Sequence, residues 1–221
     1  NGDKSGNSVS LSSDGTTLAI GAFSADTPSN PGNNSGYVKV YKWNNTTWDH
    51  LGDDIYGNTN DRSGYSVSLS DSENYGTIVA IGAPHVEVNY QSNGAVRLYK
   101  LVNNIWTKLG EDISMPYYAD VTASGNFLPG YSVSLSSDGQ TVAIGAYLSE
   151  GNALVNAGRV RVYNYKDNSW EQLGDRIDGA SYREFSGWSV SLSDDGQRVA
   201  IGAPLSDVVG NDAGIVRVYT L

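Results

Sequence analysis

The sequence repeats one ordered set of four motifs, and this repetition limits the possible folds more than any other feature. The first motif, Ser-Val-Ser-Leu-Ser, begins at residues 8, 66, 132 and 189, and Ala-Ile-Gly-Ala follows at 19–22, 80–83, 143–146 and 200–203. A third motif, Gly-x-Val-[Lys/Arg]-[Val/Leu]-Tyr, occupies 36–41, 94–99, 158–163 and 214–219. Three repeats add a fourth motif, which begins at Trp48, Trp106 and Trp170. The chain of 221 residues is therefore one repeat architecture.

Each motif predicts a β-strand, because its residues alternate in character with period two and Gly, Asn, Asp or Ser residues bound it. Asp-Gly pairs at 14–15, 138–139 and 195–196 separate the first two motifs, where a tight hairpin needs a residue that accepts positive φ. Four consecutive antiparallel strands, here named A to D, suit one blade of a β-propeller. The sequence therefore predicts a single all-β propeller domain over 1–221, with fifteen strands.

The predicted blades span 5–57, 63–115, 129–179 and 186–221, and the last blade lacks its outer strand D. Blades pack on each other, so both faces of the inner strands are buried and a bulky face must meet a small one. The serines of strand A are therefore expected to act as spacers. Their hydroxyls need partners in the interior, and neighbouring backbone carbonyls are the expected ones.

Taken in order, these motifs resemble the FG-GAP repeat of integrin α-chain propellers and of bacterial, algal and viral surface proteins. Ala83-Pro84 and Ala203-Pro204 complete the Gly-Ala-Pro element. The resemblance covers nearly the whole chain and implies an extracellular, non-catalytic adhesion or ligand-binding domain. Integrin-type repeats often hold calcium in a D-x-D-x-DG loop between strands A and B. Here that loop reads only "SSDG" or "SDDG", so we assign no metal ligand and no cofactor, and calcium stays an open alternative where Asp-rich loops converge.

Three arrangements of the blades remain open at this stage. The four blades can close into a ring whose last blade has three strands. They can also form part of a larger ring, or a protomer that another chain completes, since an uncovered strand edge favours pairing. The third arrangement would make the protein a homo-oligomer through the open edge of blade four.

The connections between strands differ between the two sides of the predicted disc. Most A–B and C–D turns are short, whereas the B–C loops and the connections between blades vary in length and content, and binding residues commonly lie on such loops. One B–C loop carries His85, Glu87 and Tyr90. The long insertion between blades two and three carries Tyr117, Tyr118, Asp120 and Phe127. Aromatic rings beside carboxylates suit a sugar or a peptide, so we take these seven residues as candidate ligand contacts.

Composition narrows the function further. The net charge of −10 and the scattered Lys and Arg residues argue against nucleic acid as a partner, and no apolar run predicts insertion into a membrane. No catalytic motif is present, and His85 is the only base candidate outside a repeated strand. We therefore expect a non-enzymatic extracellular, cell-surface or virion-surface module that binds a glycan or a protein. The alternatives are an assembly subunit whose incomplete blade another chain completes, and a polysaccharide-active enzyme.

Overall fold

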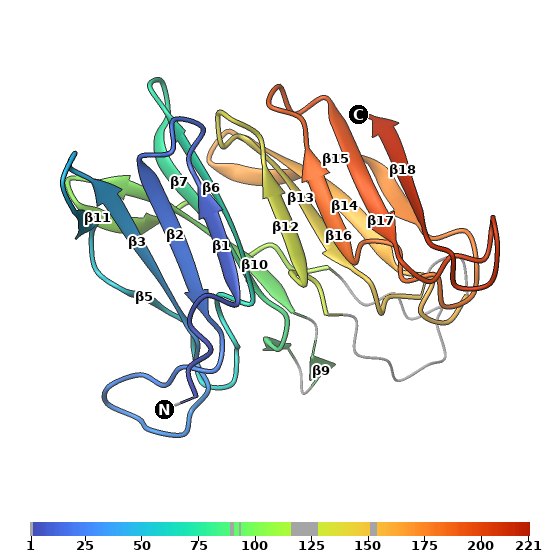
Figure 1. The fold of residues 1–221 in the computed structure, drawn as a ribbon, viewed down its shortest axis with the longest axis horizontal. Helices are drawn as coiled ribbons and strands as arrows, with labels where there is room; N and C mark the ends of the chain where they lie inside the picture. Colours follow the sequence, from blue (N-terminus) through green and yellow to red (C-terminus); the bar gives the residue numbers. More distant parts are fainter. Residues whose placement is uncertain (1, 89–90, 93, 116–127, 151–153) are drawn as a thin grey trace.

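The computed structural model describes residues 2–88, 91–92, 94–115, 128–150 and 154–221. Each sequence repeat forms one antiparallel sheet, and the four sheets are arranged as the blades of a β-propeller, as predicted (Figure 1). No helix occurs in the described residues. The fifteen predicted strands are present. Three further strands have two residues each: one begins at the last residue of the fourth motif of blade one, and the other two lie in the B–C loop of blade two.

The strands of the four blades follow the four motifs in order. Blade one contains β1 (Ser8–Leu11), β2 (Thr17–Ala22), β3 (Tyr37–Trp43) and β4 (Trp48–His50), and β5 (Ile55–Tyr56) also pairs with β3. Blade two contains β6 (Ser66–Ser72), β7 (Gly76–Ala83), β10 (Ala95–Val102) and β11 (Ile105–Lys108), while β8 (Glu87–Val88) and β9 (Gln91–Ser92) form a separate hairpin in its B–C loop. Blade three contains β12 (Ser132–Leu135), β13 (Thr141–Ala146), β14 (Arg159–Lys166) and β15 (Ser169–Asp178). Blade four contains β16 (Ser189–Leu192), β17 (Arg198–Ala203) and β18 (Ile215–Thr220), without an outer strand in the described residues.

The Asp-Gly pairs form the predicted A–B hairpin turns. Gly15 has a φ of 70°, and Asp14 Oδ1 accepts hydrogen bonds from Ser12 Oγ at 2.6 Å and from the Thr16 amide at 2.9 Å. These bonds from Ser12 and Thr16 lower the pKa of Asp14 well below its ordinary value. The carboxylate of Asp14 is therefore bonded to groups of its own hairpin, which agrees with the prediction that the Asp-Gly pair stabilises the turn.

Successive blades pack through a repeated set of apolar and hydrogen-bond contacts. Val38 and Val40 of blade one, for example, lie in one buried cluster with Val67 and Leu69 of blade two. Strand A serines then join the blades, because the hydroxyls of Ser8, Ser66 and Ser132 donate to the carbonyls of Gly64, Gly130 and Gly187 in the next blade, at 2.8–2.9 Å. Three further serines, Ser10, Ser68 and Ser134, accept from the amides of Leu69, Leu135 and Leu192, each at 2.9 Å. Backbone carbonyls are thus partners of strand A serines, and they belong to the neighbouring blade.

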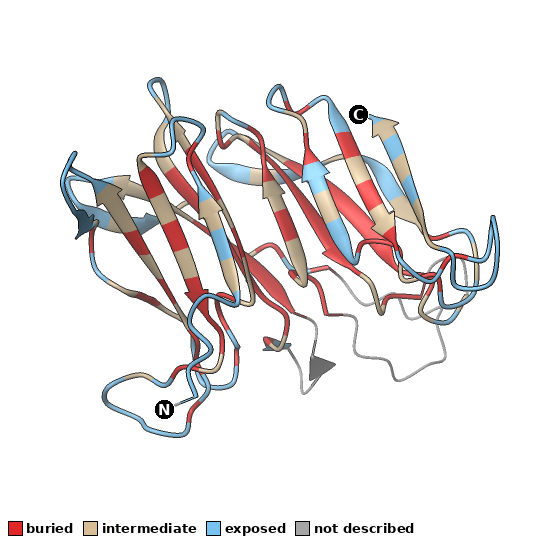
Figure 2. Cartoon of the chain, viewed as in Figure 1, coloured by how far each residue is buried: buried red, intermediate tan, exposed pale blue. Residues whose placement is uncertain are grey.

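The blades follow one another in an open arc. Strand β1 packs beside β6, β6 beside β12 and β12 beside β16, and the first and fourth blades stand at opposite ends of the row (Figure 1). The outward-facing valines of β1 and β18 are exposed, whereas the inner strands of the two middle blades are largely buried (Figure 2). Of the three arrangements that the sequence left open, the closed ring of four blades is therefore not the one observed in this single chain.

Candidate functional site

Six aromatic residues form a continuous belt across the blades, and this belt is the strongest candidate for a functional site. We call Phe23, Tyr65, Tyr131, Tyr147, Phe185 and Trp188 the aromatic belt. Tyr65, Tyr131 and Trp188 each come immediately before the serine that begins a strand A. Phe23 and Tyr147 come immediately after a strand B, and Phe185 lies in the connection to blade four. All six therefore lie on the side of the blades that carries the B–C loops and the connections between blades.

The rings of the belt contact one another in tilted or edge-on pairs. Phe23 lies 5.0 Å from Tyr65, and Tyr65 lies 5.0 Å from Tyr131, measured between ring centroids. Tyr131 then contacts Tyr147 at 4.2 Å and Trp188 at 5.1 Å. Aromatic pairs prefer such offset and tilted arrangements, which favour the attraction between ring edge and ring face. The belt is thus a preorganised surface whose rings hold one another in place.

The belt is partly open to solvent. Phe23 is buried, four members are half-buried, and Trp188 is 42% exposed. Burial, together with the hydrogen bond to Tyr65, raises the pKa of Tyr131 far above its ordinary value. Its phenol, like that of an ordinary tyrosine, is neutral at physiological pH. At the blade-one end, the Lys4 ammonium lies 5.2 Å from the centroid of the Phe23 ring. The belt therefore offers apolar ring surface, neutral hydroxyl groups and one cation at its end.

A buried ion pair fixes the connection that carries two members of the belt. Glu184 is fully buried, and its carboxylate accepts two hydrogen bonds from Arg217 of β18, at 2.8 and 3.1 Å. It also accepts from the Ala180 amide at 2.8 Å and from the Ser181 hydroxyl at 3.0 Å. Phe185 follows directly and has a φ of 56°, a left-handed conformation that costs free energy for a residue other than glycine. The bonds of Glu184 hold this strained backbone and so position Phe185.

The connection between blades one and two is built in the same way. Asp61 accepts a hydrogen bond from buried Arg97 at 2.6 Å, and Arg97 also donates to Asp112 at 2.9 Å. Arg62, which follows Asp61, has a φ of 53°. Asp61 and Glu184 were not singled out by the sequence analysis, because they lie in connections whose residues do not repeat. The signal that could have found them is an acidic residue four or more positions after the glycine that ends a blade, together with the arginine of the third motif.

The structure describes only two of the seven predicted ligand contacts. His85 is half-buried, and its Nε2 lies 3.3 Å from Arg62 Nη1. Burial and the positive charge of Arg62 lower the pKa of His85. Glu87 is exposed in β8. Tyr90, Tyr117, Tyr118, Asp120 and Phe127 lie outside the described residues, so the predicted grouping of these seven stays a prediction.

The sequence analysis did not identify the aromatic belt, although aromatic residues precede three of the four strand A motifs. The position before strand A reads Asn7, Tyr65, Tyr131 and Trp188, and therefore departs from the otherwise strict repetition of its neighbours. Only the packing of the blades shows that these positions meet the residues that follow strand B. Among the residues that the structure describes, no three His, Asp or Glu side chains come together as a metal site.

Taken together, the fold and the belt define a propeller scaffold with an aromatic surface on its loop side. No family model matches the chain, and a search of curated proteins also finds no match. The resemblance to FG-GAP repeats therefore rests on the sequence motifs alone. A search for membrane spans finds no helix in the described residues that is long and apolar enough to cross a bilayer.

Solved structures support the fold. The chain is similar to a proposed 6-phosphogluconolactonase from Bacteroides uniformis, with a TM-score of 0.57 and 12% identity over 96% of this chain and 49% of that one. It is also similar to the Dos1 propeller, with a TM-score of 0.52 and 12% identity over 96% of this chain and 43% of that one. The chain thus spans about half the length of these structures. At this identity the likeness concerns the propeller fold alone.

Proposed function

We propose that the protein is a non-catalytic binding module of an extracellular, cell or virion surface, and that it recognises a glycan or a protein through the loop side of its propeller. The aromatic belt is the single observation that carries this proposal. Partly exposed rings give a ligand a large apolar contact at little entropic cost, because the rings already hold one another. The resemblance of the motifs to FG-GAP repeats supports the same class of function.

The chemistry of the belt suits a ligand with both apolar and hydroxyl-bearing faces. The C–H face of a sugar ring, or an apolar side chain of a protein, can stack on Trp188 and Tyr131. The neutral phenols can then exchange hydrogen bonds with hydroxyl or amide groups of the ligand. The acidic net charge of −10 favours neutral or basic ligands over polyanions.

Two exposed aromatic residues permit a matched test of the belt. Trp188 and Tyr75 are both 42% exposed, but Tyr75 lies in the A–B turn of blade two, on the opposite side from the belt. A glycan array and a screen of surface proteins would first identify ligands of the wild-type chain. Trp188→Ala is then expected to weaken binding about tenfold or more, as the loss of one stacking aromatic residue commonly does, while Tyr75→Ala leaves affinity unchanged. Equal affinities for the two variants would contradict the role of the belt.

A specific observation also favours a second function, in which the protein accepts a strand from another chain. The indoles of Trp106 and Trp170 cover Gly52 and Gly110 of the preceding blade, where an added Cβ would lie 2.6 and 2.9 Å from the ring. Their Nε1 atoms donate to the carbonyls of Leu51 and Leu109. The equivalent Gly174 has nothing within 4 Å of such a Cβ.

Blade three and the free edge of β18 therefore form an uncovered indole slot. A hollow of about 440 Å³ occupies this place, and its walls are residues 173–178 and 219–221. An extended segment of the form Trp-x-x-Leu-Gly would pair with β18 and fill the slot, by addition of a strand to an open edge.

A peptide taken from blade two tests this second function directly. A labelled peptide with the sequence of residues 103–113 is expected to bind the chain, and the same peptide with Ala in place of Trp106 is expected to bind much more weakly. If both peptides bind equally, or neither binds, the slot is not a strand acceptor.

A further inference from the structure

We propose that two copies of this chain associate head to tail, so that the open face of blade four in one copy packs on the open face of blade one in the other and closes a ring of eight blades. The proposal does not rest on the aromatic belt or on the indole slot. Its basis is a comparison of the two open faces with the three interfaces that the chain already contains.

The first basis is that both end faces keep the apolar residues of an internal interface. On blade one, Val9 and Leu11 are 61% and 55% exposed, whereas the equivalent residues of blades two and three are 8–9% exposed. On blade four, Val216 and Val218 are 68% and 64% exposed, whereas their equivalents in blades one to three are at most 1% exposed. Two contiguous apolar faces of this kind mark interaction sites.

The two faces are also complementary to each other, not to themselves. At each of the three internal interfaces, two apolar third-motif residues of one blade share a buried cluster with the strand A valine and leucine of the next, as Val38 and Val40 do with Val67 and Leu69. The blade-four face supplies the first half of this contact, and the blade-one face supplies the second half. A second copy placed head to tail repeats the internal interface without any new kind of contact.

Unused hydrogen-bonding groups show the same complementarity. Among the described residues, the hydroxyls of Ser189 and Ser191 have no hydrogen-bond partner, although every equivalent serine bonds to the following blade. The register of β1 with β2 points the Leu11 amide away from β2, and it has no partner within the described chain. At a head-to-tail seam, Ser189 would donate to the Gly6 carbonyl of the second copy and Ser191 would accept from its Leu11 amide.

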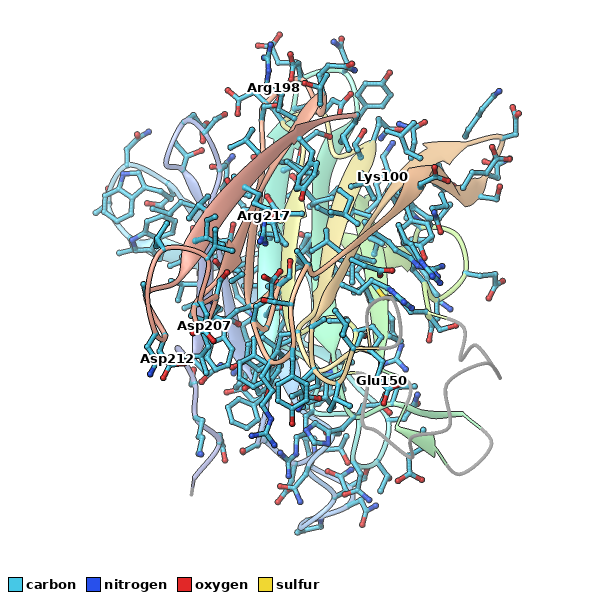
Figure 3. All side chains as sticks on the ribbon, turned by 90° about the vertical axis from the view of Figure 1, so that its right-hand side faces the viewer. Lys100, Glu150, Arg198, Asp207, Asp212 and Arg217 are labelled. Carbon is cyan, nitrogen blue, oxygen red and sulfur yellow. The ribbon has the colours of Figure 1, made fainter. Side chains whose placement is uncertain are left out.

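A hollow on blade four lies where the backbone around Gly6 of the second copy would pack. Residues 188–189, 202–204 and 213–216 line an open depression of about 480 Å³ on the open side of blade four, the blade nearest the viewer in Figure 3. Inside the chain, a Cβ added to Gly21, Gly82 or Gly145 would lie 2.0–2.2 Å from the carbonyl oxygen of the next blade. At the equivalent Gly202, no backbone atom of another blade approaches, so the space for one is open.

The number of blades also fits a pair of copies. Propellers contain about four to eight blades, and four blades form an open arc here. The propeller structures to which the chain is similar are about twice as long as the part that matches. Two arcs related by a two-fold axis would form two identical seams, each over strands A to C.

The test is the solution mass of the 221-residue chain and of face variants, measured by sedimentation over about a hundredfold range of concentration. We expect the wild type to approach twice 23.6 kDa as concentration rises. Gly202→Ala is expected to remain folded and monomeric, because its methyl group would occupy the place of the second copy's Gly6 carbonyl.

Mixing two further variants separates head-to-tail packing from packing of two blade-one faces or of two blade-four faces. Val9→Asp/Leu11→Asp disables only the blade-one face, and Val216→Asp/Val218→Asp disables only the blade-four face. All four residues are exposed in the single chain, so both variants should fold, which circular dichroism checks. Each variant alone should be monomeric, and the two mixed should form a heterodimer through one intact seam. A wild type that stays monomeric, or a mixture of folded variants that does not associate, would overturn the proposal.

Discussion

The glycine of each second motif gives the sharpest test of how the blades hold together. In Gly82→Ala, the new Cβ would lie 2.0 Å from the Gly130 carbonyl oxygen and 2.2 Å from Ser66 Oγ. Neither Gly82 nor Gly202 has a positive φ, so alanine is compatible with the backbone at both positions. Any cost therefore comes from crowding against the Gly130 carbonyl of blade three and against the Ser66 hydroxyl that donates to it.

The cost can be estimated from the contacts that must change. Overpacking of a dense interior costs about 1–3 kcal/mol, and loss of the bond between the Ser66 hydroxyl and the Gly130 carbonyl adds about 1 kcal/mol. The smaller entropy of the unfolded alanine chain returns about 0.5 kcal/mol. We expect Gly82→Ala to lower the free energy of unfolding by about 1.5–3.5 kcal/mol, as the net of these terms.

Gly202→Ala is the matched control within the same molecule. Its new Cβ would approach only Ser189 Oγ, at 2.4 Å, and that hydroxyl can rotate away because it has no partner among the described residues. Denaturant unfolding of both variants, at concentrations where the chain is monomeric, should place Gly202→Ala within about 0.5 kcal/mol of the wild type. Equal destabilisation by the two substitutions would refute the view that the carbonyl of the next blade makes this glycine necessary.

The buried ion pair of blade four leads to two linked expectations. Glu184→Gln should lower the free energy of unfolding by about 2 kcal/mol. This is less than the cost of breaking a fully buried ion pair, because Arg217 is partly exposed. The control is Glu111→Gln, which alters a fully exposed carboxylate and should have no measurable effect. Burial alone would raise the pKa of Glu184, but hydrogen bonds from Arg217, the Ala180 amide and Ser181 outweigh it and lower the pKa below 4.5. The stabilisation by Glu184 is therefore complete above pH 4.5 and is lost as the pH falls through the lowered value. In denaturant titrations from neutral pH downward, the difference between wild type and Glu184→Gln should shrink in acid, and a constant difference would exclude this carboxylate as its cause.

The fold could be predicted because its determinants repeat in register. A strand motif such as Ser-Val-Ser-Leu-Ser fixes which residues face the neighbouring blade, and four copies in the same order leave little choice of architecture. The aromatic belt could not be predicted in this way, since Tyr131 precedes β12 and Tyr147 follows β13, and the two rings meet only after this hairpin folds. The same holds for Glu184, whose partner Arg217 lies 33 residues further along the chain.

The sequence also could not predict that the arc is open. Closure of a ring depends on the rotation between successive blades, which the motifs of a single blade do not determine. Val9 and Val216 are valines, as are their buried equivalents in the other blades. The sequence of blades one and four therefore does not show that one face of each is exposed in the arc. A terminal repeat with a polar outer face would do so, as the capping repeats of other repeat proteins do. Here blades one and four both keep the apolar face. They also keep hydrogen-bonding groups that bond across the internal interfaces between blades, namely the Leu11 amide of blade one and the Ser189 hydroxyl of blade four. A chain whose two ends retain complementary halves of its own internal interface has the surfaces required to continue that interface, which is why the state of association is the property that the proposed seam experiment addresses.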